Sequence, residues 1–126
     1  FPRTTLLRES NIPADRIARY ALLDVAPDGM LRDIAEKPDD ETMQRMATAP
    51  ISMNVWRFDR EIFRACRDVP PSPRGELELP LAVRYAVRVL GLRIRAIEFA
   101  GGVLDLSSRA DIASVAARLR GVPVQL

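Results

Sequence analysis

The stretch RYALLDVAPDGMLRDIAEKP, residues 19–38, carries two strand signals on either side of a turn signal. Residues 19–25 include a short apolar run, and residues 30–35 alternate apolar with charged side chains, as a half-buried strand does. The four residues between them, APDG, have the composition of a tight turn. This stretch therefore predicts a β-hairpin.

Elements of both kinds continue along the chain after the hairpin. Helices are indicated by acidic, serine or proline residues at their starts and by apolar residues at helical spacing, and strands by apolar and aromatic runs. Helices are predicted at residues 39–49, from Asp59, at residues 80–90 with Pro80 in the first turn, and after Ser107 or Ser108, and strands at residues 51–58, 92–99 and 103–106. Ser108 and Asp111 have the spacing of a capping box with Asp in place of Glu. This alternation with one hairpin predicts an α/β fold with a mixed sheet and flanking helices.

The length and composition are those of one globular domain. The chain has 126 residues, of which 48% are hydrophobic and 29% charged, enough for a single modest core. We expect residues 19–120 to form this domain. Residues 1–18 mix proline, polar and scattered apolar positions and are predicted to be a connector or trimmed N-terminal segment. Residues 121–126 are predicted to be a C-terminal tail.

Several functional classes are excluded by composition. The chain has no histidine, which excludes Ser-His-Asp and Cys-His catalytic arrangements. Its one cysteine, Cys66, cannot form an internal disulfide, so we expect a reducing, cytoplasmic environment. The 19 basic residues are interleaved with 17 acidic ones, which argues against nucleic-acid binding. No stretch approaches the roughly 20 apolar residues of a membrane span, so no membrane partner is expected.

Glu36 and Lys37 stand side by side at the end of the second predicted strand, before Pro38. Neighbouring residues of a strand project to opposite sides, so each can face a different part of one ligand. An ammonium group suits a phosphate, and a carboxylate suits the hydroxyls of a polyol. Lys37 is also the sole lysine beside 18 arginines. The alternative is that both are solvated charges at a strand end.

Three more polar residues are candidates for a site. Asn54 lies in a predicted apolar strand, where its amide needs a partner, either a ligand hydroxyl or a neighbouring loop. Glu76 follows a proline-rich loop and a glycine, and the alternative is an ordinary loop acid. Asp105 is flanked by apolar residues, where an unpaired charge is costly. Either a divalent cation or an arginine is expected to neutralise it.

Taken in order, these segments resemble the C-terminal part of the sugar-1-phosphate nucleotidyltransferases, the nucleoside-diphosphate-sugar pyrophosphorylases. The resemblance covers about residues 19–120. It is carried by an ordered series of features: Glu36-Lys37-Pro38, ISMNVWRF at residues 51–58, the helix from Asp59, RGELEL at residues 74–79 and VLDL at residues 103–106.

The resemblance implies a Rossmann-like mixed sheet and a reaction in which a sugar 1-phosphate attacks the α-phosphate of a nucleoside triphosphate, releasing pyrophosphate. It implies that Lys37 is catalytic and binds the sugar phosphate, and that Glu36 binds the sugar hydroxyls. Asn54 and Glu76 would line the sugar pocket, and Asp105 would be one of two carboxylates that bind Mg²⁺. This displacement depends on charge neutralisation and positioning, so it needs no histidine.

The nucleotide-binding half of the family is not recognisable in this sequence. No Gly-rich loop precedes residue 75, and nothing in residues 1–18 is suited to cradle a triphosphate. We therefore interpret the chain as the sugar-1-phosphate-binding half, inactive alone, with the nucleoside triphosphate bound by a missing N-terminal half. A truncated sheet exposes an edge, so we expect either self-association or a partner chain that covers it.

The alternative from another class is a non-catalytic αβ interaction or regulatory module. One concave surface that gathers Glu36, Lys37, Asn54 and Asp105 would favour ligand binding. Pairing of Asp105 with an arginine far from Lys37 would favour the interaction module.

Overall fold

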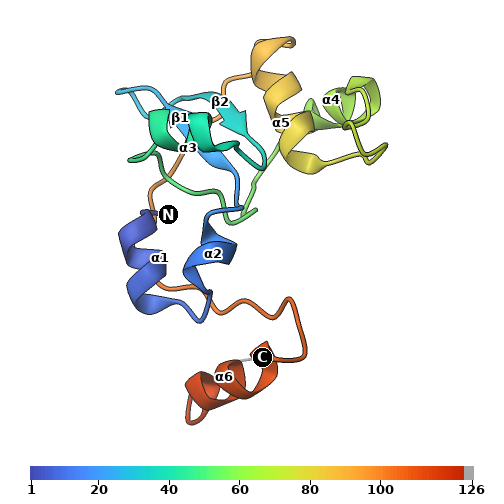
Figure 1. Ribbon diagram of the computed structural model, residues 1–126. Helices are drawn as coiled ribbons and strands as arrows, with labels where there is room; N and C mark the ends of the chain where they lie inside the picture. Colours follow the sequence, from blue (N-terminus) through green and yellow to red (C-terminus); the bar gives the residue numbers. More distant parts are fainter. Residues whose placement is uncertain (124–126) are drawn as a thin grey trace.

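The computed structural model describes residues 1–123 and combines helices with a small sheet. The hairpin and one helix lie at one end of the molecule, two helices pack beside them, and the last helix lies at the opposite end (Figure 1). In chain order the elements are α1 (Arg3–Glu9), α2 (Ala14–Ile17), β1 (Leu22–Val25), β2 (Leu31–Ala35), α3 (Asp40–Arg45), α4 (Ile62–Asp68), α5 (Leu79–Arg88) and α6 (Asp111–Leu119).

The predicted hairpin is confirmed. β1 and β2 pair antiparallel, with Leu22 opposite Ala35 and an irregularity in the register at the turn end of β1. In the turn, the Asp28 carboxylate accepts the Met30 N–H at 3.0 Å. Gly29 has a φ of +82°, which glycine adopts without the steric cost of a side chain. The turn predicted from the residues APDG is therefore present between the two strands.

Three of the predicted strands, at residues 51–58, 92–99 and 103–106, do not form, and these predictions were wrong. Residues 51–58 and 92–99 each make a single isolated bridge to the hairpin, through Ile51 and Arg95. A strand requires a neighbour that supplies backbone partners along its length. Within residues 1–123 the pairing of these segments does not extend beyond the two bridges, and the sheet consists of β1 and β2. The structure is thus mixed α and β, and it does not contain the larger mixed sheet that was expected.

Residues 1–18 are folded, whereas the sequence predicted a connector or trimmed segment. Leu6 of α1, Ile17 of α2 and Ile12 between the two helices are buried against Leu22 and Ile51, and these five residues are the first hydrophobic cluster. Phe1 also packs against this cluster, and its backbone carbonyl accepts the Ile51 N–H at 2.8 Å. Apolar side chains that are scattered in the sequence therefore meet on one side of two short helices.

The helices predicted around the hairpin are confirmed within a few residues. Asp39 caps α3 and accepts the Thr42 N–H at 2.8 Å. Hydrogen bonding from Thr42, first from its side chain and then from its N–H, lowers the pKa of Asp39. α5 begins at Leu79 with Pro80 in its first turn, as predicted, and α4 begins three residues after Asp59. α4 and α5 pack against each other around a second hydrophobic cluster, which consists of Ile62, Ala65 and Ala86.

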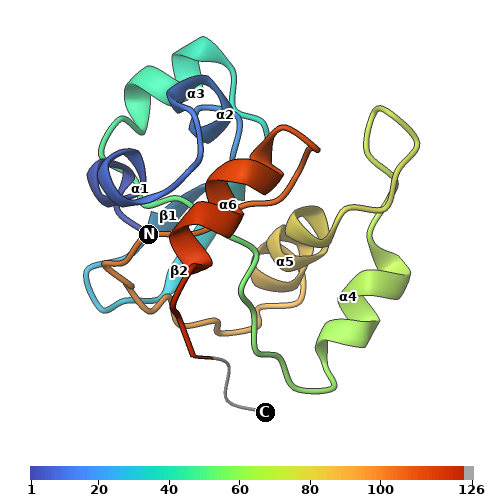
Figure 2. The ribbon, with the colours of Figure 1, turned by 90° about the horizontal axis from the view of Figure 1, so that it is seen from below.

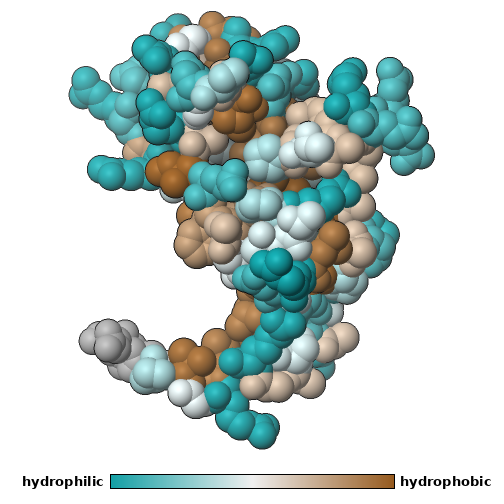
Figure 3. Space-filling view, turned by 90° about the vertical axis from the view of Figure 1, so that its left-hand side faces the viewer, coloured by the Kyte–Doolittle hydropathy of each residue, from teal (hydrophilic) through white to brown (hydrophobic). Residues whose placement is uncertain are grey.

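The last helix, α6, lies apart from the hairpin and is nearest the viewer when the molecule is seen from below (Figure 2). It is amphipathic, yet Ile112 and Leu119 remain exposed. Polar bonds hold it instead, because Arg118 donates to the backbone carbonyls of Glu9 and Ser10. Apolar side chains are visible on the surface of the part of the molecule that contains α6 (Figure 3). Of the predicted tail, residues 124–126 lie outside the described residues.

Among the helices of residues 1–123, none combines the length and the apolar character that a bilayer crossing requires.

Candidate functional site

Glu36 and Lys37 lie together beside an open cleft of about 900 Å³. The cleft is bordered by both strands of the hairpin, by α3 and by the first turns of α5. Lys37 follows β2 and has a φ of +47°, in the left-handed region. That backbone turn is costly for a residue with a side chain, and it ends the strand at the rim of the cleft.

An ionic cluster surrounds Lys37. Its ammonium group donates to the Glu78 carboxylate at 3.1 Å, and Arg74 contacts the same carboxylate. Arg74 also pairs with Glu76 at 2.9 Å. Lys37 and then Arg74 lower the pKa of Glu78, whereas burial raises the pKa of Glu36 against the opposing effect of Lys37. Three carboxylates and two cations therefore meet where β2 ends and α5 begins.

The structure thus brings three of the predicted site residues, Glu36, Lys37 and Glu76, into one neighbourhood. Glu78 and Arg74, which lie in the segment RGELEL, complete the cluster, and neither was predicted as a site residue. Sequence reasoning missed Glu78 as a partner because it lies 41 residues from Lys37, so no local signal joins the two.

Asn54 is not part of this cluster. It is exposed, has a φ of +55° and lies outside any strand, so the prediction of an amide inside an apolar strand was wrong. Its backbone N–H donates to the Ser52 hydroxyl at 3.3 Å. Asparagine tolerates the left-handed conformation better than most residues, and this positive φ turns the chain where a strand was expected.

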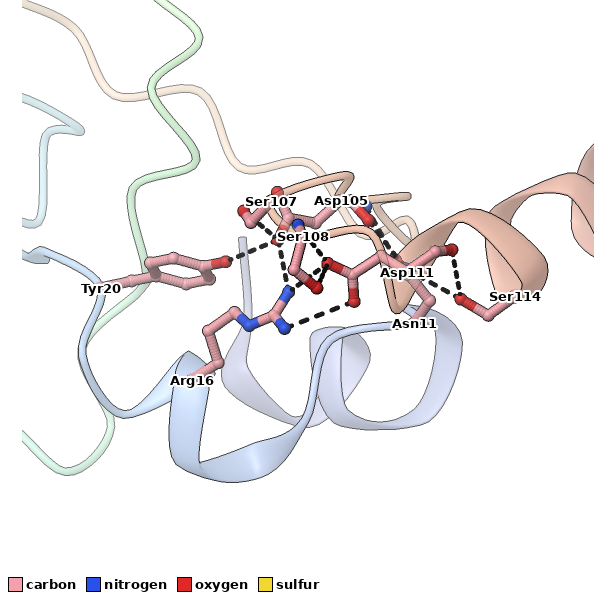
Figure 4. A network of polar contacts seen from close by, with 8 residues as sticks. All are labelled: Asn11, Arg16, Tyr20, Asp105, Ser107, Ser108, Asp111 and Ser114. Atoms are coloured by element: carbon pink, nitrogen blue, oxygen red, sulfur yellow. Dashed lines mark hydrogen bonds and ion pairs between the residues drawn. The ribbon is translucent and has the colours of Figure 1, made fainter.

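Asp105 belongs to a separate network that joins α2 to the start of α6 (Figure 4). Arg16 donates to its carboxylate at 2.9 Å, and the Ser107 hydroxyl donates at 2.6 Å. The Tyr20 hydroxyl lies 3.5 Å from the same oxygen. The Asn11 side chain bonds the backbone of Asp105 in both directions, at 2.8 and 2.7 Å. Of the two expected ways to neutralise Asp105, the structure shows the arginine.

Asp111 is the second carboxylate of this network. Arg16 contacts both of its oxygens, at 3.2 and 3.3 Å, and Ser108 donates to it through its backbone N–H and its hydroxyl. The predicted contact between Ser108 and Asp111 therefore forms, but Ser108 does not cap the helix, because the N-cap residue of α6 is Ala110. Arg16 was not predicted, because residues 1–18 were interpreted as a connector.

The surroundings of Asp105 do not fit a magnesium ion. A guanidinium group already occupies the position beside its carboxylate that a cation would take. Within residues 1–123 there is also no group of three or more acidic, histidine or cysteine side chains that could hold a metal ion. Asp105 as a magnesium ligand stays a prediction that rests on the family resemblance.

Replacing Arg16 with alanine should destabilise the fold at neutral pH and much less in acid. Arg16 first, and then Ser108, hold the pKa of Asp111 below its usual value. A carboxylate whose pKa is lower in the folded state stabilises the fold above its unfolded pKa of about 3.9, and this contribution is lost as the pH falls through the folded value. Urea unfolding at pH 7 and pH 3 measures the difference between variant and parent at each pH.

The matched control is Arg19→Ala. Arg19 is exposed and lies 3.9 Å from Asp15, so its loss should change stability little at either pH. An Arg16→Ala effect that is the same at pH 3 and pH 7 would contradict a role through carboxylate pairing.

Comparison with known proteins gives a partial likeness. UTP–glucose-1-phosphate uridylyltransferase AglF of Haloferax volcanii is 31% identical to this chain over 97 residues. The matched part is 77% of this chain and 37% of the relative, so the chain spans little more than a third of that protein's length. No family model matches the chain. The likeness supports a link to nucleotidyltransferases at the family level.

Proposed function

We propose that this chain is the acceptor part of a nucleotidyltransferase, in which the cleft beside Glu36 and Lys37 binds a sugar 1-phosphate. The observation that carries the proposal is that a lysine and a glutamate, Lys37 and Glu36, line the same cleft. The partial likeness to a glucose-1-phosphate uridylyltransferase supports the same substrate class. In this proposal the hairpin belongs to a Rossmann-like sheet.

The two residues would have different roles in the cleft. The Lys37 ammonium would bind the phosphate and offset the charge that develops during phosphoryl transfer. The Glu36 carboxyl group would bond sugar hydroxyls, which suits its partly buried position. Asn54 and Glu76 remain proposed sugar contacts, and Glu76 is the nearer in the fold to Lys37 because Arg74 links it to Glu78.

Calorimetric titration of the chain with glucose 1-phosphate, glucose and inorganic phosphate tests the proposal. We expect glucose 1-phosphate to bind more tightly than either of the other two, because it alone can use both Lys37 and Glu36. Equal binding of glucose 1-phosphate and phosphate would contradict the sugar site, and absence of binding would contradict the proposal. We expect these 126 residues alone, given UTP, glucose 1-phosphate and Mg²⁺, to release no pyrophosphate.

A second candidate is a non-catalytic interaction or regulatory module. It is favoured by the pairing of Asp105 with Arg16 in a network other than the Lys37 cluster, because the expected metal carboxylate then has a structural role. A folded chain that binds neither glucose 1-phosphate nor phosphate would support this candidate over the first.

A further inference from the structure

We propose that Glu78 is a positioning residue, which holds the Lys37 ammonium group at the rim of the cleft in the orientation that receives a phosphate. This inference rests on the proposed function. Lys37 and Glu78 are 41 residues apart in sequence, and their side chains meet at 3.1 Å where β2 ends and α5 begins. The Glu78 side chain is 17% exposed and that of Lys37 is 49% exposed, so the carboxylate is the more enclosed partner.

The place of Glu78 in the fold gives its carboxylate no evident role in its own helix. Glu78 is the N-cap residue of α5, but its side chain accepts no capping bond from the first turn. Side chains at this position commonly accept a backbone N–H of the helix. The Glu78 carboxylate instead bonds Lys37 and Arg74, which come from the end of β2 and from the proline-rich loop.

The charges around Glu78 keep this arrangement in place at neutral pH. Lys37 and then Arg74 lower the pKa of Glu78, so its carboxylate is ionised at neutral pH. An ammonium group has three N–H donors, and Glu78 accepts one of them. The other donors can therefore bond phosphate oxygens while the pair with Glu78 persists. Holding the flexible side chain in advance lowers the entropy that binding costs.

The opposite role for the same contact is competition, in which Glu78 blocks Lys37 and a phosphate must displace it. The two roles predict opposite results for the neutral variant Glu78→Gln. If Glu78 positions Lys37, this variant should bind glucose 1-phosphate about three- to tenfold more weakly, the range expected for ordering one long side chain. If Glu78 competes with the phosphate, the variant should bind more tightly, and the proposal is then overturned.

Two further variants sharpen the experiment. Glu78→Asp keeps the charge and should recover part of the lost affinity, which a purely structural role for side-chain bulk would not explain. Asp68→Asn removes a carboxylate that Arg64 and Arg67 contact on α4, away from the cleft, and should leave the affinity unchanged. Thermal unfolding of each variant shows whether the fold is retained, and Glu78→Asp tests the proposal if Glu78→Gln is unfolded.

Nuclear magnetic resonance of the lysine ammonium group gives a readout that does not depend on a ligand. Lys37 is the sole lysine, so a chain labelled with ¹⁵N-lysine gives one side-chain ammonium signal. We expect this signal to report greater mobility in Glu78→Gln than in the parent or in Asp68→Asn. Unchanged mobility would overturn the positioning role. If the parent binds no glucose 1-phosphate, the proposed function fails; if the parent binds and Glu78→Gln binds equally well, only the inference about Glu78 fails.

Discussion

Leu6→Ala is expected to lower the free energy of unfolding by about 2–5 kcal/mol, the range for truncating a buried leucine. Leu6 is 0% exposed and contributes to the first hydrophobic cluster together with Ile17 and Leu22. Domains of this size are stabilised by only about 5–15 kcal/mol, so the loss is a large share of the total. Urea unfolding followed by circular dichroism measures the change.

Leu7→Ala is the matched control, since it makes the same chemical change one position along the same helix. Leu7 is 48% exposed, and we expect a much smaller loss of stability from its truncation. Equal effects of the two variants would mean that α1 does not pack on the core as the structure shows. The pair therefore tests directly that residues 1–18 belong to the folded domain.

Lys37→Ala is expected to weaken the binding of glucose 1-phosphate by about ten- to a hundredfold. The variant removes the ammonium group at the rim of the cleft, and hydrogen bonds to charged groups contribute about 1.5–3 kcal/mol each. Calorimetric titration with glucose 1-phosphate measures the loss. Binding of glucose itself should change little, because that ligand has no phosphate.

Two other substitutions make this result specific. Lys37→Arg keeps the charge but not the compact geometry, so we expect an intermediate affinity. Arg60→Ala removes an exposed cation that does not border the cleft, and it should bind as the parent does. A Lys37→Ala variant with parental affinity would show that the cleft is not the phosphate site.

Local signals in the sequence were sufficient for the hairpin and for several helices. The turn APDG, the acidic start of α3 and the proline at the start of α5 act within a few residues of the element that they determine. Such signals do not depend on what the rest of the chain does, and the structure confirms each of these elements.

The larger sheet could not be predicted in the same way, because a strand depends on a partner that is distant in sequence. Residues 51–58 and 92–99 have the composition of strands, yet each makes one bridge to the hairpin. Val55 is 80% exposed, so its apolar character is not used in the core of the described residues. Composition indicates which segments are able to form strands, but it does not indicate how far each one pairs with another segment in the fold.

The residues of the candidate site also differ in whether local sequence features could identify them. Glu36 and Lys37 were found from their adjacency at a strand end, which is a local feature. The partners Glu78 for Lys37 and Arg16 for Asp105 lie 41 and 89 residues away in sequence, and only the folded chain identifies them. The need for a partner at Asp105 was predictable from its apolar neighbours, whereas the choice of Arg16 was not.

Because the core is divided into two clusters of different size, we expect the two parts of the chain to differ in the free energy of local unfolding. The cluster between α4 and α5 has three buried residues, and the one around Leu22 has five. Local opening requires less free energy where fewer apolar contacts are lost, so amide protons of α4 should exchange with solvent before those of β1.

The ion pair between Lys37 and Glu78 joins the end of the hairpin to the start of α5. An anion bound there would therefore slow amide exchange in α5 as well as in the hairpin.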